Sequence, residues 1–272
     1  MLAFAGNSLL CRVALNHAGM DPASFTLLRL VAGAVTLWLI VRLRRTTAQA
    51  ADQGSWGSGA ALYVYAGAFS AAYVTLPAGT GALLLFGAVQ FTMVGGGLWR
   101  GDRLRMAQWA GLALALTGLV LLMLPGVSAP PLQGALLMLI AGFAWGIYSL
   151  RGQRRGDATR VSAGNFARAV PLAVGASLAS LVWLEGATTS APGVGYALLS
   201  GAVTSGIGYA IWYAAVPHLK APTAATVQLS VPVLATLAGI LFLGETLTWR
   251  LALACLAILG GIALVVGVRR VR

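Results

Sequence analysis

Long apolar runs, separated by short segments that carry the charges, constrain the fold of this chain more than any other feature. Each run approaches the roughly 20 residues that a helix needs to cross a bilayer, and the runs lack the apolar–polar alternation of membrane β-strands. The sequence therefore predicts an all-α membrane protein with ten transmembrane helices. The expected spans are about residues 1–16, 23–41, 57–76, 79–98, 107–124, 132–150, 163–184, 193–215, 221–243 and 248–268.

The composition agrees with a bilayer as the solvent. Of the 272 residues, 59% are apolar and only 9% are charged, whereas a soluble domain carries roughly a quarter charged residues. This deficit excludes a disordered chain, a coiled coil and a disulfide scaffold, and it weighs against a soluble enzyme. The net charge of +12 comes from short clusters and not from a continuous basic face, so we expect no nucleic-acid partner.

The basic clusters recur after every second span. The other loops hold acidic residues, the single Arg250, or no charge. Because positively charged loops stay in the cytoplasm, both termini are predicted to be cytoplasmic, which agrees with an even number of spans in a bacterial inner membrane. The basic residues that set this topology are Arg42, Arg44, Arg45, Arg100, Arg103, Arg105, Arg151, Arg154, Arg155, Arg160, Lys220, Arg269, Arg270 and Arg272.

An internal duplication is visible in the loops. Residues 101–104 (Gly-Asp-Arg-Leu) precede the fifth span as residues 244–247 (Gly-Glu-Thr-Leu) precede the tenth. The chain therefore divides into two five-span units, 1–124 and 132–268, and an odd number of spans inserts the second copy upside down. Inverted repeats are a common plan of secondary transporters, with the substrate site near mid-membrane between the copies. An old duplication without a transport role is the alternative.

The sequence resembles the EamA-like members of the drug/metabolite transporter superfamily. The resemblance rests on residues 6–8 (Gly-Asn-Ser), Arg29, residues 144–148 (Ala-Trp-Gly-Ile-Tyr), residues 230–233 (Ser-Val-Pro-Val) and residues 243–245 (Leu-Gly-Glu). Their order and spacing cover essentially the whole chain. The resemblance implies ten helices in two five-helix repeats, as the span count and the duplication also suggest.

Within the superfamily, the chain is most similar to bacterial exporters of aromatic and other amino acids. This narrower resemblance rests on residues 143–148 (Phe-Ala-Trp-Gly-Ile-Tyr) and residues 208–212 (Gly-Tyr-Ala-Ile-Trp). The chain departs from the family pattern in two places, because it has Asp102 in place of the usual Glu and no proline in the first repeat opposite Pro232. These departures leave the substrate preference open.

Polar and amphipathic aromatic side chains within the spans mark the candidate substrate site. In lipid such groups need partners or water, and Tyr and Trp combine an apolar body with a polar tip. Ser205, Tyr209 and Trp212 follow at i, i+4 and i+7, on one helical face. The other candidates are Trp145, Tyr148, Tyr63, Gln90, Asn7 and Gln228. Helix packing or an interfacial aromatic belt is the alternative.

Two arginines occupy corresponding places in the two repeats, Arg29 in the second span and Arg168 in the seventh. Either guanidinium could hold a carboxylate. We favour the alternative, in which both side chains reach toward the membrane interface or link to loop carbonyls.

Pro232 is expected in the middle of the ninth span, where it cannot donate a hydrogen bond to the carbonyl of Gln228. A carbonyl freed in this way must be satisfied by protein or by a watery cavity. It either faces substrate or belongs to a packed kink.

The charges also bear on the mechanism. All six carboxylates fall in or beside loops, whereas ion-coupled carriers usually place an ionisable group within the membrane. Facilitated export becomes plausible, with coupling through His, Tyr or backbone carbonyls left open. No phosphate-binding loop surrounds Lys220, so we expect no nucleotide, cofactor or metal.

Other classes fit less well. An intramembrane hydrolase would need a zinc motif or a nucleophile with its base, a channel would need a symmetric filter, and a structural protein would not need polar and aromatic clusters within its spans. We therefore expect a monomeric transporter that exports amino acids and related small metabolites by alternating access. An exporter of amphipathic, cationic drugs with the same fold is the alternative.

Overall fold

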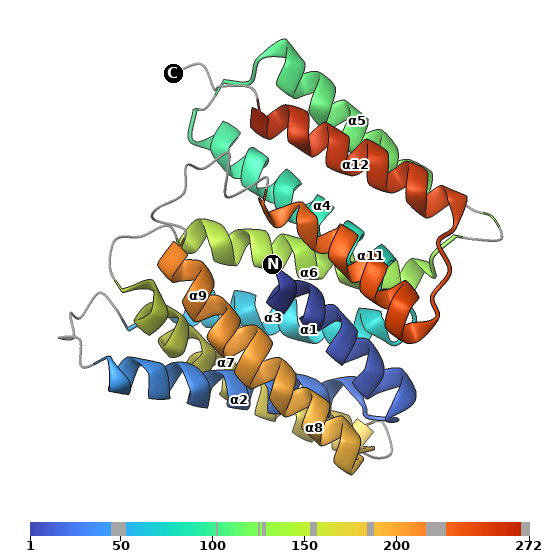
Figure 1. Ribbon diagram of the computed structural model, residues 1–272. Helices are drawn as coiled ribbons and strands as arrows, with labels where there is room; N and C mark the ends of the chain where they lie inside the picture. Colours follow the sequence, from blue (N-terminus) through green and yellow to red (C-terminus); the bar gives the residue numbers. More distant parts are fainter. Residues whose placement is uncertain are drawn as a thin grey trace.

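The computed structural model describes residues 1–44, 53–101, 103–124, 126, 129–152, 157–183, 188–215 and 227–267, and every regular element in these ranges is a helix (Figure 1). Two π-helical segments, η1 and η3, continue α1 and join α8 to α9. The elements are α1 (Leu2–Arg12), η1 (Val13–His17), α2 (Pro22–Leu43), α3 (Trp56–Tyr73), α4 (Ala78–Trp99), α5 (Met106–Met123), α6 (Leu132–Arg151), α7 (Ala158–Trp183), α8 (Ala191–Leu199), η3 (Ser200–Ile207), α9 (Gly208–Ala215), α11 (Ser230–Leu243) and α12 (Trp249–Gly267).

Each of the ten expected spans coincides with a helix of the described part, when α1 with η1 and α8 with η3 and α9 are taken as continuous rods. Seven of these helices are long and apolar enough to cross a membrane: α2, α4, α5, α6, α7, the rod from α8 to α9, and α12. Helix α11 is apolar but shorter. The first residues of the ninth expected span, 221–226, lie outside the described residues.

Several loop residues that carry the topology prediction or the family pattern also lie outside the described residues. These are Arg45, Asp102, Arg154, Arg155, Lys220, Arg269, Arg270 and Arg272.

The position of Asp21 is explained by the helix end that it caps. The carboxylate of Asp21 accepts hydrogen bonds from the backbone N–H groups of Ala23 and Ser24, at 3.0 and 2.9 Å. Pro22 follows as the first helical residue, a position where its missing N–H removes no helical bond. At a helix C-terminus, Gly244 ends α11 with a φ of 64°, which glycine adopts without strain. Asp21 is therefore a structural cap.

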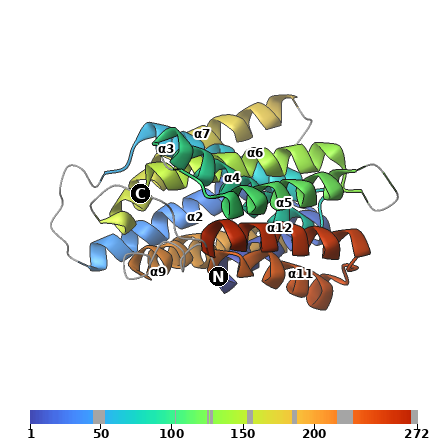
Figure 2. The ribbon, with the colours of Figure 1, turned by 90° about the horizontal axis from the view of Figure 1, so that it is seen from above.

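Helices α2 and α7 pack against each other in opposite directions. Arg44 at the end of α2 donates to Thr159 Oγ1 at the start of α7, while Ser177 further along α7 donates to the carbonyl of Ala23 at the start of α2. Figures 1 and 2 show α5 and α12 side by side as well.

The α5–α12 pair shows the same antiparallel arrangement. Gln108 at the start of α5 donates to the carbonyl of Val265 near the end of α12, at 2.8 Å. The two backbones approach where Gly111 faces Gly261, and a Cβ on either glycine would collide with the backbone of the other helix. Close contact through glycine is typical of helix packing in membranes.

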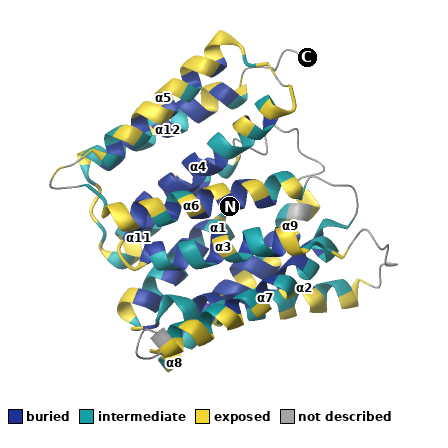
Figure 3. Cartoon of the chain, turned by 180° about the vertical axis from the view of Figure 1, so that it is seen from behind, coloured by how far each residue is buried: buried dark blue, intermediate teal, exposed yellow. Residues whose placement is uncertain are grey.

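Large apolar side chains cover the outer faces of the helices, while the buried residues line their inner faces (Figure 3). Leu39, Ile140 and Leu241, for example, are 47%, 48% and 76% exposed. A water-soluble monomer rarely shows so much contiguous apolar surface, so these faces fit a lipid environment.

Candidate substrate site

Trp145 lies at the centre of an aromatic cluster that joins helices from both halves of the chain. Its ring stacks on Tyr148 one turn along α6, with centroids 5.3 Å apart and planes 23° apart. Tyr65 of α3 approaches it at 4.9 Å, Tyr209 of α9 meets it edge-on at 5.2 Å, and Phe4 of α1 lies at 6.5 Å. Trp145 is only 8% exposed.

The α3 side of the cluster follows from helical spacing. Tyr65, Phe69 and Tyr73 are each four residues apart, so they lie along one face of α3. Neighbouring rings in this row contact each other at 5.5 and 4.7 Å between centroids, and all three side chains are buried. The row extends the cluster from Trp145 along the helix.

A narrow cavity opens within the cluster. It holds about 20 Å³, which is room for one water molecule. Its lining combines rings with polar side chains: Phe4, Ser8, Tyr65, Phe69, Trp145 and Gln228, with Leu85 and Phe86. A metabolite of amino-acid size needs more room, so binding requires the surrounding helices to move.

Arg29 reaches this cluster from α2 and is buried, with only 2% of its surface exposed. Its Nε donates to Ser205 Oγ and its Nη2 donates to Tyr65 Oη, both at 3.1 Å. The guanidinium lies 5.2 Å from the ring centre of Tyr65 and 5.0 Å from that of Phe69. The expectation that Arg29 reaches the interface or a loop carbonyl is therefore wrong, because its partners lie on the inner faces of α3 and η3.

Arg168 behaves as expected. Its Nη1 donates to the carbonyls of Gln53, at 2.6 Å, and Gly164, at 3.0 Å. Gln53 belongs to the segment that leads into α3, so this arginine links α7 to a connecting segment at one end of the bundle.

The π-helical segment η3 makes a second buried polar contact, in this case with α1. Asn7 of α1 accepts hydrogen bonds through Oδ1 from Ser200 Oγ, at 2.6 Å, and from Thr204 Oγ1, at 3.3 Å. All three side chains are buried. π-Helical turns often occur at functional sites, and this one also carries Ser205, the partner of Arg29.

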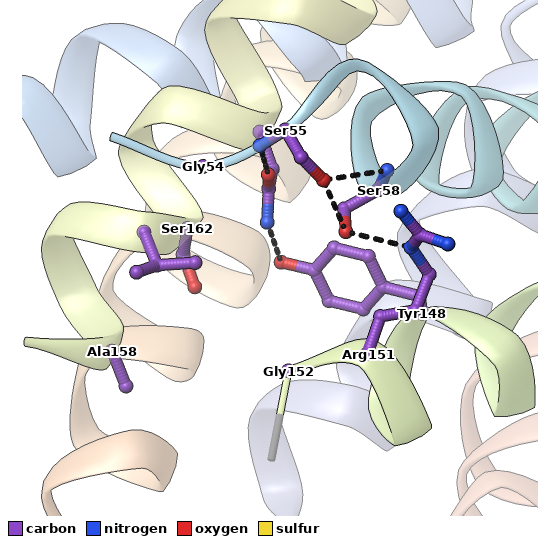
Figure 4. A pocket seen from close by; sticks show the side chains of 10 residues that line it. Gly54, Ser55, Ser58, Tyr148, Arg151, Gly152, Ala158 and Ser162 are labelled. Atoms are coloured by element: carbon purple, nitrogen blue, oxygen red, sulfur yellow. Dashed lines mark hydrogen bonds between the residues drawn. The ribbon is translucent and has the colours of Figure 1, made fainter. Parts of the chain in front are cut away.

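A polar pocket of about 70 Å³ lies at the end of the bundle where α3 begins and α6 ends (Figure 4). Arg151 Nε donates to Ser58 Oγ at 3.3 Å, and Asn165 Nδ2 donates to Tyr148 Oη at 3.5 Å. Figure 4 shows the Tyr148 ring between these groups. Because Tyr148 also stacks on Trp145, it separates this pocket from the central cluster.

The opposite end is held by an ion pair. Arg12 Nε lies 3.3 Å from Glu245 Oε1, and both oxygens of Glu245 accept from the backbone N–H of Ala78, at 3.0 and 2.9 Å. Arg12 Nη1 also donates to the carbonyl of Tyr73. These contacts tie α1, α3, α4 and α11 together beside a pocket of about 440 Å³ that Glu245 helps to line.

The remaining predicted site residues are only partly brought together. Trp212 meets Phe4 edge-on at 6.2 Å and so joins the cluster at its margin, and Gln228 lines the cavity. Gln90 is buried on α4, and its Nε2 has no hydrogen-bond partner in the described part of the chain. Tyr63 is half-buried on a different face of α3 from Tyr65.

Pro232 does not occupy a mid-helix position among the described residues. Helix α11 begins at Ser230, so Pro232 lies in its first turn, where an N–H would have no helical acceptor in any case. The carbonyl of Gln228 therefore lies just before a helix start and still receives no hydrogen bond from Pro232. The side chain of Gln228 lines the cavity.

Sequence analysis missed Tyr65, Phe4 and Phe69 as site residues and misjudged Arg29. Two signals could have found them. The spacing of Tyr65, Phe69 and Tyr73 marks one face of α3, and Arg29 is a charge within a span that has no acidic residue. Within the described ranges, no group of three His, Cys, Asp or Glu side chains could hold a metal ion.

Comparison with known proteins gives a consistent result. The model of the EamA-like transporter family matches residues 132–267. An uncharacterized protein of Pseudomonas aeruginosa is 58% identical over 271 residues, which cover 99% of this chain and 92% of that protein. A protein of Salmonella typhimurium named "probable amino-acid metabolite efflux pump" is 28% identical over 218 residues, or 75% of this chain and 72% of that protein.

The fold also matches a solved structure. A crystal structure described only as that of a protein has a TM-score of 0.66 and 20% sequence identity, and the match covers 97% of this chain and 96% of the other. With its helices, its apolar outer faces and the family match, the chain belongs to the EamA-like transporter family, as a multi-pass membrane transporter of small molecules and not an enzyme.

Proposed function

We propose that this protein exports amino acids and related small metabolites across the bacterial inner membrane by alternating access. The observation that carries the proposal is the cavity beside Trp145, which rings from α1, α3, α4 and α6 line together with the polar side chains of Ser8 and Gln228. An amphipathic solute matches such a lining, because aromatic faces bind its apolar part while hydroxyl and amide groups orient its polar part. The Salmonella typhimurium relative's name supports the substrate class.

The substrate contacts that we propose are those of the sequence prediction, extended by the cluster. Trp145, Tyr148, Tyr209 and Trp212 supply rings, and Asn7, Ser205 and Gln228 supply polar groups. Of these residues, Trp145 and Gln228 line the narrow cavity. The other five, together with Gln90 and Tyr63, are candidates for the lining of a wider one.

We further propose that residues 1–124 and 132–268 are two inverted repeats of five helices. The packing supports this division, because helix pairs that contact each other correspond to other contacting pairs when the two halves are exchanged. The pair α3–α6 corresponds to η3–α1, and the pair α4–α6 corresponds to α11–α1. Corresponding helices, such as α2 and α7, run antiparallel. Transporters built in this way move one set of helices against the other around a central site.

The two ends of the bundle support an orientation. The end that carries Arg44, Arg100 and Arg151 is basic, so the positive-inside rule places it, with both termini, in the cytoplasm. The pocket at Tyr148 would then be the cytoplasmic entrance, and the Arg12–Glu245 pair would close the outer side. No described helix contains Asp or Glu, which favours facilitated export over a carboxylate proton relay.

Export of cationic drugs is the second candidate. The same rings favour it, because aromatic faces attract cations. The buried positive charge of Arg29 at the cluster opposes it, since like charges repel strongly in a low-dielectric site.

The test is transport by the purified full chain in proteoliposomes, with labelled phenylalanine, tryptophan, leucine and threonine and with an organic cation for comparison. We expect amino-acid flux above that of empty liposomes, with and without a pH gradient. Flux of the cation alone would favour the second candidate, and flux of neither would overturn the proposal.

A further inference from the structure

Arg29 brings a charge into the membrane without a counter-ion in the described part of the chain. Its guanidinium has five N–H donors, of which the structure pairs one on Nε and one on Nη2. Nη1 is buried and has no hydrogen-bond partner among the described residues. A buried charged donor without an acceptor is costly, so its retention needs an explanation.

The acidic residues of the described ranges are occupied elsewhere. Asp21 caps α2, Asp157 accepts from the backbone N–H of Thr159 at 3.0 Å at the start of α7, and Glu245 pairs with Arg12. Each of them lies at a helix end or in a loop, and no described helix includes a carboxylate. Tyr65 and Ser205 offer Arg29 neutral oxygens, which satisfy hydrogen bonds and leave the charge in place.

The position of this charge relates it to the cavity. Tyr65 and Phe69, over whose rings the guanidinium lies, are two of the residues that line the cavity. Trp145, whose ring contacts that of Tyr65 at a tilt, lines the same space. A solute whose apolar part contacts Trp145 therefore has its other end within the field of an uncompensated guanidinium.

We propose that Arg29 anchors the anionic group of the substrate, so that this transporter recognises small molecules that carry a carboxylate beside an apolar or aromatic part. This inference rests on the proposed site and narrows its substrate class. Guanidinium and carboxylate form a strong charge-assisted pair, and the described residues supply no carboxylate to Arg29. A substrate that brings the carboxylate neutralises the charge when it binds, whereas a purely cationic compound adds a second positive charge.

A purely structural role for Arg29 gives a different expectation. Such a brace between α2, α3 and η3 would use only the bonds to Ser205 and Tyr65. Removing it would weaken the fold and the binding of all solutes equally. If Arg29 anchors a carboxylate, removing it instead changes the ratio of the affinities for an acid and for its analogue without the carboxylate. This ratio is the quantity to measure.

The experiment uses the full chain in detergent and proteoliposomes, with three matched probes: L-phenylalanine, L-phenylalaninamide and 3-phenylpropionate. For the unmodified protein we expect both carboxylates to bind at least about tenfold more tightly than the amide, the size of one hydrogen bond to a charged group. Arg29→Gln should abolish this preference and should bind the amide as well as before or better. Arg29→Lys, which keeps the charge, should retain part of the preference.

Arg168→Gln is the matched control, because that arginine bonds to carbonyls at the end of the bundle and should leave the preference unchanged. Thermal unfolding of each variant, with and without probe, separates loss of fold from loss of recognition. Equal binding of acid and amide by the unmodified protein, an acid preference that survives in Arg29→Gln, or no binding of any probe would each overturn the inference. Binding of 3-phenylpropionate that depends on Arg29, without amino-acid transport, would support the anchor and refute amino-acid export.

Discussion

Arg29 and Arg168 belong to α2 and α7, two helices that pack antiparallel, yet they have different surroundings. Each of them packs against a glycine of a neighbouring helix. A Cβ on Gly201 would collide with the backbone of Arg29, and a Cβ on Gly59 would collide with Arg168. Arg29 then turns inward to Ser205 and Tyr65, while Arg168 turns to the carbonyls of Gln53 and Gly164. Similar backbone packing thus accompanies an inward-facing guanidinium on α2 and a link to backbone carbonyls on α7.

The difference lies in what each guanidinium can still bind. The carbonyls around Arg168 are near the end of the bundle, and the side chain is half-buried. Arg29 lies over two rings, and its Nη1 has no hydrogen-bond partner in the ranges that the structure describes. The comparison predicts that changes in the central region alter transport itself, whereas equivalent changes at the end alter mainly stability.

The largest expected effect comes from Trp145→Ala in the central region. Loss of the ring that contacts Phe4, Tyr65, Tyr148 and Tyr209 should lower flux of the transported amino acid at least about tenfold, because stacking and orientation are lost together. Trp99→Ala is the control, since Trp99 is 93% exposed at the end of α4. Equal flux in both variants, measured in proteoliposomes, would remove Trp145 from the site.

The second effect concerns the two glycines. Gly201→Ala should push η3 away from α2 beside Arg29 and lower the free energy of unfolding by about 1–3 kcal/mol, the usual range for overpacking. We also expect weaker substrate binding, measured by the ligand-induced shift in unfolding temperature.

Gly59→Ala tests the corresponding contact at Arg168. It should destabilise the protein to a similar extent, because its Cβ would meet Arg168 and the carbonyl of Asn165. Substrate affinity in the folded fraction should stay the same. An affinity loss as large as that of Gly201→Ala would show that the two regions do not differ in function.

A smaller effect is expected from Tyr65→Phe. The ring remains against Trp145, but Arg29 Nη2 loses its acceptor, which should cost about 1.5 kcal/mol of stability, the lower end of the range for a hydrogen bond to a charged group. Unfolding in denaturant measures this cost. If added 3-phenylpropionate stabilises Tyr65→Phe more than the unmodified protein, the carboxylate replaces the missing acceptor; less stabilisation would argue against contact between the two groups.

The smallest effect is expected at the opposite end, from Glu245→Gln. The amide can still accept from the backbone N–H of Ala78, so only the charge attraction to Arg12 is lost, and a partly exposed ion pair contributes about 0.5–1 kcal/mol. We expect a small fall in the unfolding temperature of the variant. The difference from the unmodified protein should become smaller at high salt, which screens the ion pair. If the pair closes the outer side, the same variant should exchange substrate faster; unchanged exchange would limit it to a structural role.

Much of the fold could be read from the sequence because lipid restricts the possible structures so strongly. Runs such as 107–124 and 132–150 end within a few residues of helices α5 and α6. Within the described part of the ninth span the helix is interrupted at Leu229, and α11 begins at Ser230, which places Pro232 in a first turn. Hydropathy does not report where an apolar run breaks its helical hydrogen bonds.

The site was predictable only in part. Spacing along one helix identified Trp145 with Tyr148 and Ser205 with Tyr209, because residues three or four apart share a face. It could not show which faces meet. Tyr63 and Tyr65 are equally plausible in the sequence, and only the packing of α3 against α6 turns Tyr65 toward Trp145.

The helical, membrane-embedded character of this chain could be read from the amino-acid sequence, since long apolar runs and basic clusters are properties of the chain alone. The inward direction of Arg29 and the direction of Arg168 toward a connecting segment follow from helix packing and could not be read from the sequence. A helical arginine can direct its long side chain toward several neighbours, and the choice depends on which acceptors the adjacent helices present. Here those acceptors are Tyr65 and Ser205 for one arginine and backbone carbonyls for the other.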